Sequence, residues 1–203
     1  MTLPKHFCWT RFGTEAGETI DAILKRKELE RLKNGGVFLW GIGNAVGPSM
    51  KELVQRESCP EVIFSPIRSR AKHIDVAPAA TVIWKSGRDL NGVVSPLPSG
   101  STVVSRISSK GIQAARHYAL VCFSDKSLQL IADPLMFSIG SLENIRRGSP
   151  IGASQVTAIV RQRYQPNLVC QIYPEAMRFQ LVAPFFLELL DPSIVNEVSR
   201  AWI

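Results

Sequence analysis

The sequence contains no apolar run long enough to cross a bilayer. Its longest apolar stretch, residues 181–190, is about half the length that a spanning helix needs and contains Pro184 and Glu188. The N-terminal sequence MTLPKHFCWTR has neither the apolar stretch nor the small-residue cleavage site of a signal peptide. We therefore expect a cytoplasmic protein with no membrane partner.

Cysteine and histidine are scarce, with four cysteines and three histidines in the chain. No two cysteines form a CxxC pair. Cys8, Cys122 and Cys170 lie in apolar, strand-like contexts, which favours buried free thiols over zinc ligands or disulfides. We expect no metal and no cofactor.

Motifs for covalent catalysis are also missing. The sequence has no G-x-S-x-G and no recognisable Cys–His signature, and its histidines are isolated. A metal-dependent nuclease needs several converging acids, and Asp75 with Lys85 is a poor match to that pattern. We expect no catalytic residues, although an enzyme acting on nucleic acid or on a nucleotide remains an alternative.

The composition predicts one globular domain. The chain has 203 residues, of which 45% are hydrophobic and 20% are charged, so a sizeable core can form. We expect a single domain over residues 1–203, with a barrel core at about 6–175 and a C-terminal extension at about 176–203. The fold class that we expect is α+β: a small mixed β-barrel of six to eight strands, two early helices and a C-terminal helix.

The order of elements follows from hydrophobic periodicity and turn residues. A strand at 6–12 is followed by a helix at 18–32, whose mixed-sign polar face is expected to be solvated. A strand at 37–40 then precedes a helix at 49–56 that begins with a capping box of Ser49 and Glu52.

Beyond this helix, β-branched and aromatic segments alternate with turns. They are the residue ranges 61–67, 80–87, 101–107, 117–124, 155–164 and 168–173. The turn-rich loop 86–101 is a candidate flap over a site. Asp191 and Pro192 are typical of a helix start, so the last segment is expected to be helical.

The net charge of +7 is unevenly distributed. Residues 62–120 contain eight basic and two acidic residues, and residues 144–174 contain four arginines and no acid. Such asymmetry is typical of a surface that binds phosphates. The alternative is that a mildly basic protein simply exposes its charge on one face.

A glycine loop, GIGNAVG, follows the strand at 37–40. Its spacing, G-x-G-x-x-x-G, and the proline after Gly47 do not fit a dinucleotide fingerprint, and no acid stands about 20 residues on. The glycines instead allow a sharp turn and a close backbone approach, either to a neighbouring strand or to an anionic ligand at the start of the next helix.

Aromatic residues stand beside basic ones or next to the glycine loop. Trp9 is close to Arg11, Trp84 precedes Lys85, and Trp40 comes directly before the glycine loop. Flat aromatic walls can stack on bases while cations neutralise the backbone, and a single base can be extruded into such a pocket. For any one tryptophan alone, the favoured interpretation is a core residue at a strand end.

These segments resemble the start of the PUA-like superfamily, which includes the ASCH, EVE and YTH domains. The resemblance covers mainly residues 6–90 and rests on FCWTRF, AILKRKELERL and GGVFLWGIGN, with the later strands compatible with a small barrel. It implies binding of RNA or DNA, a pocket walled by Trp9, Trp40 and Trp84, and a base-edge contact from Asn44.

We therefore expect a nucleic-acid-binding reader domain, probing a modified or flipped base, whose partner is DNA or RNA. The alternative partner is a protein, or a second copy of the chain, docked on the apolar segment 180–190. The residues expected to bind nucleic acid are Trp9, Arg11, Trp40, Asn44, Arg68, Arg70, Lys72, Trp84, Arg106 and Lys110.

Overall fold

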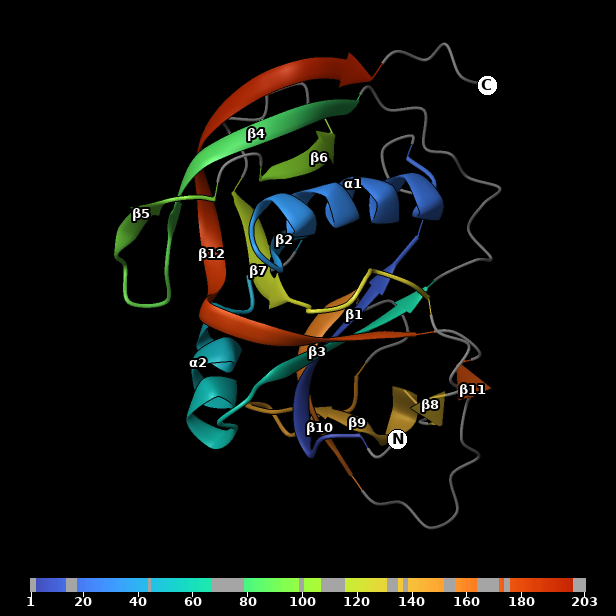
Figure 1. The fold of residues 1–203 in the computed structure, drawn as a ribbon. Coiled ribbons are helices and arrows are strands. Elements are labelled where there is room, and N and C mark those ends of the chain that lie inside the picture. Colours follow the sequence, from blue (N-terminus) through green and yellow to red (C-terminus); the bar gives the residue numbers. More distant parts are fainter. Residues whose placement is uncertain are drawn as a thin grey trace.

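The computed structural model describes residues 3–13, 18–43, 45–66, 79–98, 101–106, 116–130, 135–136, 139–151, 156–163, 172–173 and 176–198. Within these ranges the chain is mostly strand, with the helices α1 (Ile20–Lys33) and α2 (Gly47–Arg56) packed against the sheet (Figure 1). A short 3-10 helix covers Ile139–Ser141. The strands are β1 (His6–Phe12), β2 (Val37–Ile42), β3 (Glu61–Pro66), β4 (Ala79–Arg88), β5 (Val94–Pro96), β6 (Thr102–Arg106), β7 (His117–Phe123), β8 (Leu135–Met136), β9 (Leu142–Asn144), β10 (Thr157–Gln162), β11 (Ile172–Tyr173) and β12 (Met177–Val198).

The main sheet is open and mixed. Its hydrogen-bonded order is β2-β7-β12-β3-β1-β10-β9; β4 also pairs with β12 and carries β5 and β6 on its other edge. Strands β1 and β3 run parallel, and the remaining pairs in this sheet are antiparallel. The prediction of an α+β barrel of six to eight strands is therefore wrong, because the described strands form a larger sheet that does not close.

The outer edge of β2 shows why the sheet stays open there. Strand β6 lies near β2 but does not pair with it. The backbone N–H of Leu39 in β2 instead donates to the Glu30 carboxylate of α1, over 2.8 Å. A helix side chain thus satisfies a donor that barrel closure would have used.

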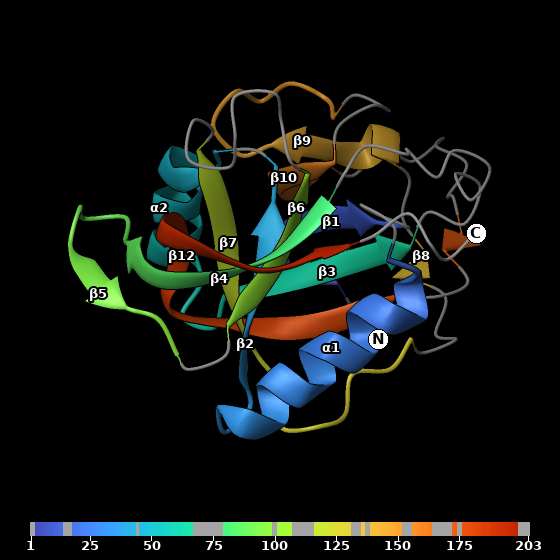
Figure 2. The ribbon, with the colours of Figure 1, turned by 90° about the horizontal axis from the view of Figure 1, so that it is seen from above.

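Strand β12 connects the two halves of the sheet. It pairs with β3 through residues 177–180, then with β7, and finally with β4 through residues 188–198. Figure 2 shows this path, with β12 beside β3 in one part and beside β4 in the other. The register shifts between Leu181 and Phe186, where Pro184 follows a cis peptide bond and Phe185 has a φ of 68°. Proline lacks the N–H that a continuous ladder needs, so the bend falls at this position.

The predicted C-terminal helix is wrong, because residues 191–198 continue β12. Asp191 does not cap a helix; it has a φ of 55° and accepts a hydrogen bond from the Ser86 hydroxyl. Pro192 lies opposite Trp84 in the ladder with β4. Long-range pairing with β4 therefore overrides a local pattern that is typical of a helix start. The expected extension at about 176–203 is consequently, as far as residue 198, an integral part of the sheet.

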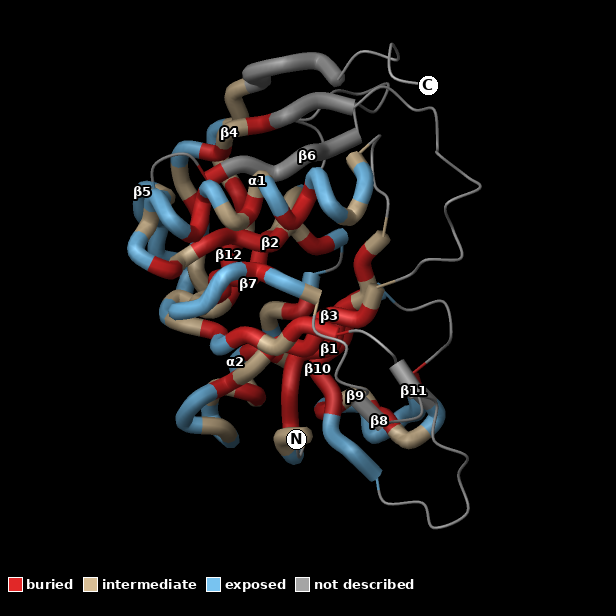
Figure 3. The backbone as a smooth tube through the Cα atoms, turned by 45° about the vertical axis from the view of Figure 1, so that its right-hand side comes forward, coloured by how far each residue is buried: buried red, intermediate tan, exposed pale blue. Residues whose placement is uncertain are grey.

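Buried residues concentrate along the central strands (Figure 3). They form three clusters: a large one under α1 and α2 that includes Phe38 and Met50, a second around Phe7 and Ile63, and a third around Leu39 and Leu187. Cys8 and Cys122 are buried in the large cluster, as predicted, whereas Cys59 is exposed and Cys170 lies outside the described residues.

Helix α1 begins and ends as its sequence indicates. Thr19 accepts the Ala22 N–H as N-cap, and the helix stops at Asn34 before Gly35 and Gly36, which have φ values of 60° and 100°. The prediction that its polar face is solvated is only partly right. Three of its charged residues are buried: Lys27, Glu30 and Arg31.

Candidate functional site

The three tryptophans that the sequence suggested as pocket walls lie apart. Trp9 belongs to the cluster with Phe7, Trp40 to the large cluster, and Trp84 to the cluster with Leu39. Their exposed fractions are 0%, 6% and 3%. The structure therefore does not bring them together as one aromatic pocket, and each has the environment of a core residue.

The contacts of these rings are typical of a packed interior. Trp9 donates from Nε1 to the Ser65 hydroxyl, and Trp40 packs against Phe64 with ring centroids 4.4 Å apart. Trp84 lies 4.7 Å from the ring of His117, and its Nε1 is buried without a hydrogen-bond partner in the part of the chain that the structure describes.

Apart from the tryptophans, most residues that were predicted to contact nucleic acid lie outside the described residues. Arg11 is the residue before the last in β1, where its backbone N–H donates to the Val156 carbonyl, and Arg106 ends β6. The other predicted contacts lie outside the described residues: Asn44, Arg68, Arg70, Lys72 and Lys110.

Many arginines that the charge count included are held in ion pairs. Glu143, which is buried, accepts Arg161 at 2.9 Å and Arg163 at 3.1 Å. Glu188 pairs with Arg88 at 3.0 Å and lies 3.8 Å from Arg116. Such cations are less available to a polyanion than the sequence implied, because a carboxylate already compensates them.

Two arginines on one turn differ from these. Arg146 and Arg147 follow β9, and the side-chain oxygen of Asn144 accepts both of their backbone N–H groups at 3.1 Å. A further bond from Gly148 N–H to the Asn144 carbonyl, at 2.9 Å, closes the turn. Neither guanidinium forms an ion pair with any residue that the structure describes. The turn therefore presents, side by side, two cations that no carboxylate of the described residues compensates.

These arginines line a pocket at the start of α2, which we call the α2 pocket. Its volume is about 460 Å³. The lining residues are Ala45, Val46, Pro48, Ser49, Asn144, Arg146, Arg147, Thr157, Ala158 and Ile159. Helix α2, the turn after β9 and strand β10 thus meet at one place.

The start of α2 is not capped by a side chain. The helix begins at Gly47 rather than at Ser49, and its N-cap residue is Val46, whose side chain has no oxygen to offer the amides of the first turn. The predicted capping box is wrong: Ser49 lies inside the first turn, and Glu52 pairs with Arg56 at 2.7 Å. The first N–H groups of α2 therefore have no side-chain partner among the described residues, and the positive end of the helix dipole faces this region.

A larger cleft lies on the other side of α2, which we call the apolar cleft. Its volume is about 880 Å³, and it is bordered by α2, the bend of β12 and the hairpin of β4 and β5. This hairpin is the loop 86–101 that the sequence suggested as a flap, and its residues from Gly87 to Pro98 form one wall. Sequence patterning located this wall but gave no sign of the floor, which comes from distant strands.

The described residues offer little for metal or thiol chemistry. No three His, Cys, Asp or Glu side chains gather among them as a metal site would require. His6 bonds through Nδ1 to Glu57 at 2.6 Å. Burial raises the pKa of Cys8 and of Cys122, so both are neutral thiols rather than nucleophiles.

The apolar segment 180–190, which the sequence suggested as a docking face, is part of β12. Its side chains Leu181, Phe186, Leu187 and Leu189 are buried. The segment therefore packs inside this molecule instead of presenting a free surface.

None of the helices in the described residues is long and apolar enough to span a bilayer. Comparisons with family models, with curated proteins and with solved structures found no match for the chain. The PUA-like resemblance accordingly stays a prediction, and function must be argued from this chain's own geometry.

Proposed function

We propose that this protein binds nucleic acid and that the α2 pocket holds a backbone phosphate. One observation carries the proposal: Arg146 and Arg147, neither in an ion pair with a described residue, emerge from a single turn beside the uncapped start of α2. The net charge of +7 supports it, because a basic protein attracts polyanions over a distance.

The chemistry of the pocket suits a phosphate. Backbone N–H groups at a helix start donate to anionic oxygens, and the helix dipole favours negative charge there. Guanidinium groups add bidentate, charge-assisted hydrogen bonds. The hydroxyl of Ser49, on the first turn of α2, supplies another polar group at the rim.

The proposal concerns the backbone and not the base. Phosphate contacts position a nucleic acid without reading its sequence. Because Trp9, Trp40 and Trp84 are buried apart, they offer no stacking surface in this conformation. We therefore expect similar affinity for unrelated sequences of one length.

The test is fluorescence anisotropy with short DNA and RNA oligonucleotides at two salt concentrations. The wild type should bind more weakly at high salt. The logarithm of its binding constant should fall with the logarithm of the salt concentration, with a slope of roughly 0.7–0.9 for each phosphate neutralised. The double substitution Arg146→Ala and Arg147→Ala should lower affinity for all sequences alike. It should also reduce the salt slope by roughly the amount that two phosphate contacts contribute.

Arg88→Ala is the matched control. Arg88 is also exposed but is paired with Glu188 at 3.0 Å, so its loss should leave affinity nearly unchanged. Absence of binding at low salt would refute nucleic-acid binding itself. Equal losses in the double variant and in Arg88→Ala would refute the α2 pocket as the contact.

A further inference from the structure

The apolar cleft shares no lining residue with the α2 pocket and has a different character. Its floor is formed by Leu39, Val121 and Leu187, one from each of the adjacent strands β2, β7 and β12. Its walls add Val54 from α2 and Leu97 from the hairpin. A volume of about 880 Å³ is within the range of clefts that enclose a small organic molecule.

The hairpin wall of the cleft is built by specific contacts. The Asp89 carboxylate accepts the N–H groups of Asn91 and Val93 at 2.8 and 2.9 Å and so fixes the turn of the hairpin. Gly87 lies against Leu187, where an added Cβ would come within 3.1 Å of that side chain. The glycine therefore lets β4 close onto the floor. A preformed cleft lowers the ordering cost of binding.

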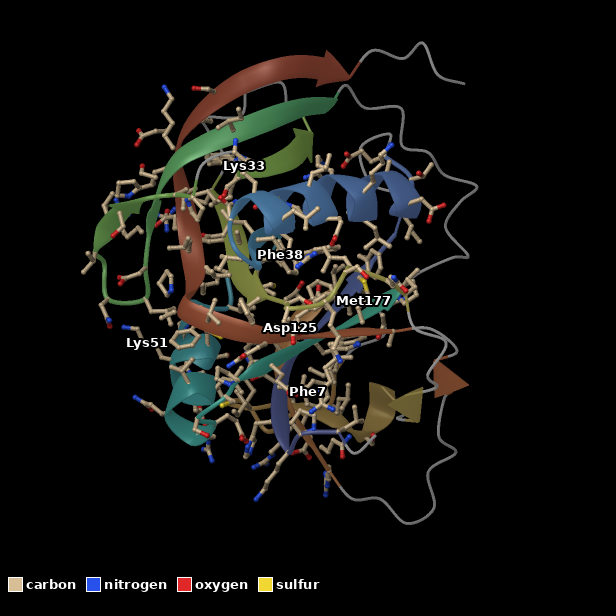
Figure 4. The ribbon with its side chains drawn as sticks, in the orientation of Figure 1. Phe7, Lys33, Phe38, Lys51, Asp125 and Met177 are labelled. Carbon is tan, nitrogen blue, oxygen red and sulfur yellow. The ribbon has the colours of Figure 1, made fainter. Side chains whose placement is uncertain are left out.

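One cation stands at the rim. Lys51 projects from α2 where the helix approaches the bend of β12 (Figure 4), and it forms no ion pair with any described residue. The acid at the rim, Asp89, is already used by two backbone N–H groups of its own turn. These hydrogen bonds orient the Asp89 carboxylate within its own turn, and Lys51 is the one cation among the described lining residues that can pair with an anionic ligand.

The same residues argue against an added peptide strand as the occupant. The Leu39 N–H on the free edge of β2 is already bonded to Glu30. On the opposite wall, Pro96 and Pro98 have no N–H to donate. Neither side offers the run of donors that strand addition requires.

We infer that the apolar cleft binds a small amphipathic organic anion, with its apolar body on the floor of β2, β7 and β12 and its anionic end at Lys51. Carboxylate, sulfonate and phosphate ends share this chemistry. The ligand is bound, and no bond in it is made or broken.

The experiment uses dodecanoate and dodecanol, which share one alkyl chain and differ in charge. Each is titrated below its aggregation limit against the full chain in the absence of nucleic acid, with displacement of 8-anilinonaphthalene-1-sulfonate as the readout. Dodecanoate should bind more tightly than dodecanol. Lys51→Gln should lower dodecanoate affinity about two- to fivefold and leave dodecanol unchanged; the exposed Lys126→Gln should change neither.

A second variant tests the location. Val54→Phe fills the cleft from α2 and should weaken both ligands about tenfold or more. Val156→Phe makes the same change at an exposed position away from the cleft and should have no effect. A folded Val54→Phe protein that binds as tightly as the wild type, or dodecanol affinity equal to that of dodecanoate, overturns the inference. Failure of dodecanoate to bind overturns it as well and leaves the nucleic-acid proposal untouched, because the α2 pocket and the apolar cleft have no lining residue in common.

Discussion

Helix α1 carries three ion pairs, whereas the start of α2 has two cations beside it that pair with no described residue. On α1, Lys27 bonds Glu30 at 2.7 Å, Arg31 bonds Glu28 at 2.7 Å, and Arg26 bonds Glu18 at 2.7 Å. Beside α2, Arg146 and Arg147 emerge from a turn in which the side-chain oxygen of Asn144 accepts their backbone N–H groups.

The difference shows that charged residues in one sequence can have two different roles. The Lys27–Glu30 pair is buried and ties α1 to β2, because Glu30 also accepts the Leu39 N–H at 2.8 Å. The charges of α1 therefore act on folding. Those next to α2 remain open to solvent, where they can act on a ligand.

The largest effect is expected from Lys27→Met. This change leaves the Glu30 carboxylate buried without its cation, which typically costs about 3–5 kcal/mol of unfolding free energy. Burial lowers the pKa of Lys27, and Glu30 opposes that shift, so the lysine depends on its partner to stay charged. Urea unfolding monitored by circular dichroism measures the loss.

The double variant Lys27→Met with Glu30→Gln is the control. Glutamine can still accept the Leu39 N–H but needs no counter-ion, so the double variant should regain part of the lost stability. A double variant as unstable as the sum of both single changes would show that charge pairing is not what α1 contributes.

Local sequence patterns located the two helices and most strands because periodicity and turn residues act over a few residues. The helix expected at 18–32 is α1, which spans Ile20–Lys33 in the structure. The path of β12 could not be predicted, because Asp191 and Pro192 fit a helix start and only the distant partner β4 makes them a strand.

The candidate site was harder to predict for a similar reason. The tryptophans have basic or glycine neighbours in sequence but apolar neighbours in space. The sequence showed that residues 146 and 147 are basic, yet no local pattern distinguishes these two arginines from Arg161 and Arg163, which are paired. The distinction arises in the folded chain, where Glu143 on β9 pairs with Arg161 and Arg163.

An intermediate effect is expected from Glu28→Gln on α1. Hydrogen bonds from Arg31 lower the pKa of Glu28, burial opposes the shift, and the Leu128 N–H adds to it. Because the folded pKa is depressed, the ionised carboxylate stabilises the fold above the unfolded value near 4.5. The contribution is lost as the pH falls through the folded pKa.

At pH 7 the substitution should therefore cost about 1 kcal/mol, and the difference from wild type should shrink as the pH is lowered below the unfolded value. Urea unfolding at a series of pH values measures it. A difference that stays constant into the acid range would mean that Glu28 acts through shape rather than through charge.

The smallest effect is expected from Glu52→Gln on α2. Glu52 pairs with Arg56 one turn later at 2.7 Å, but Arg56 is 48% exposed and water competes for both groups. Pairs of this kind contribute about 0.3–0.5 kcal/mol, and salt screens them further. Unfolding at low and at high salt should show a small loss that disappears at high salt. A loss near that of Glu28→Gln would mean that α2 also depends on its ion pairs for folding. The contrast between α1, whose charges stabilise the fold, and the region of α2, where charges face a ligand, would then no longer hold.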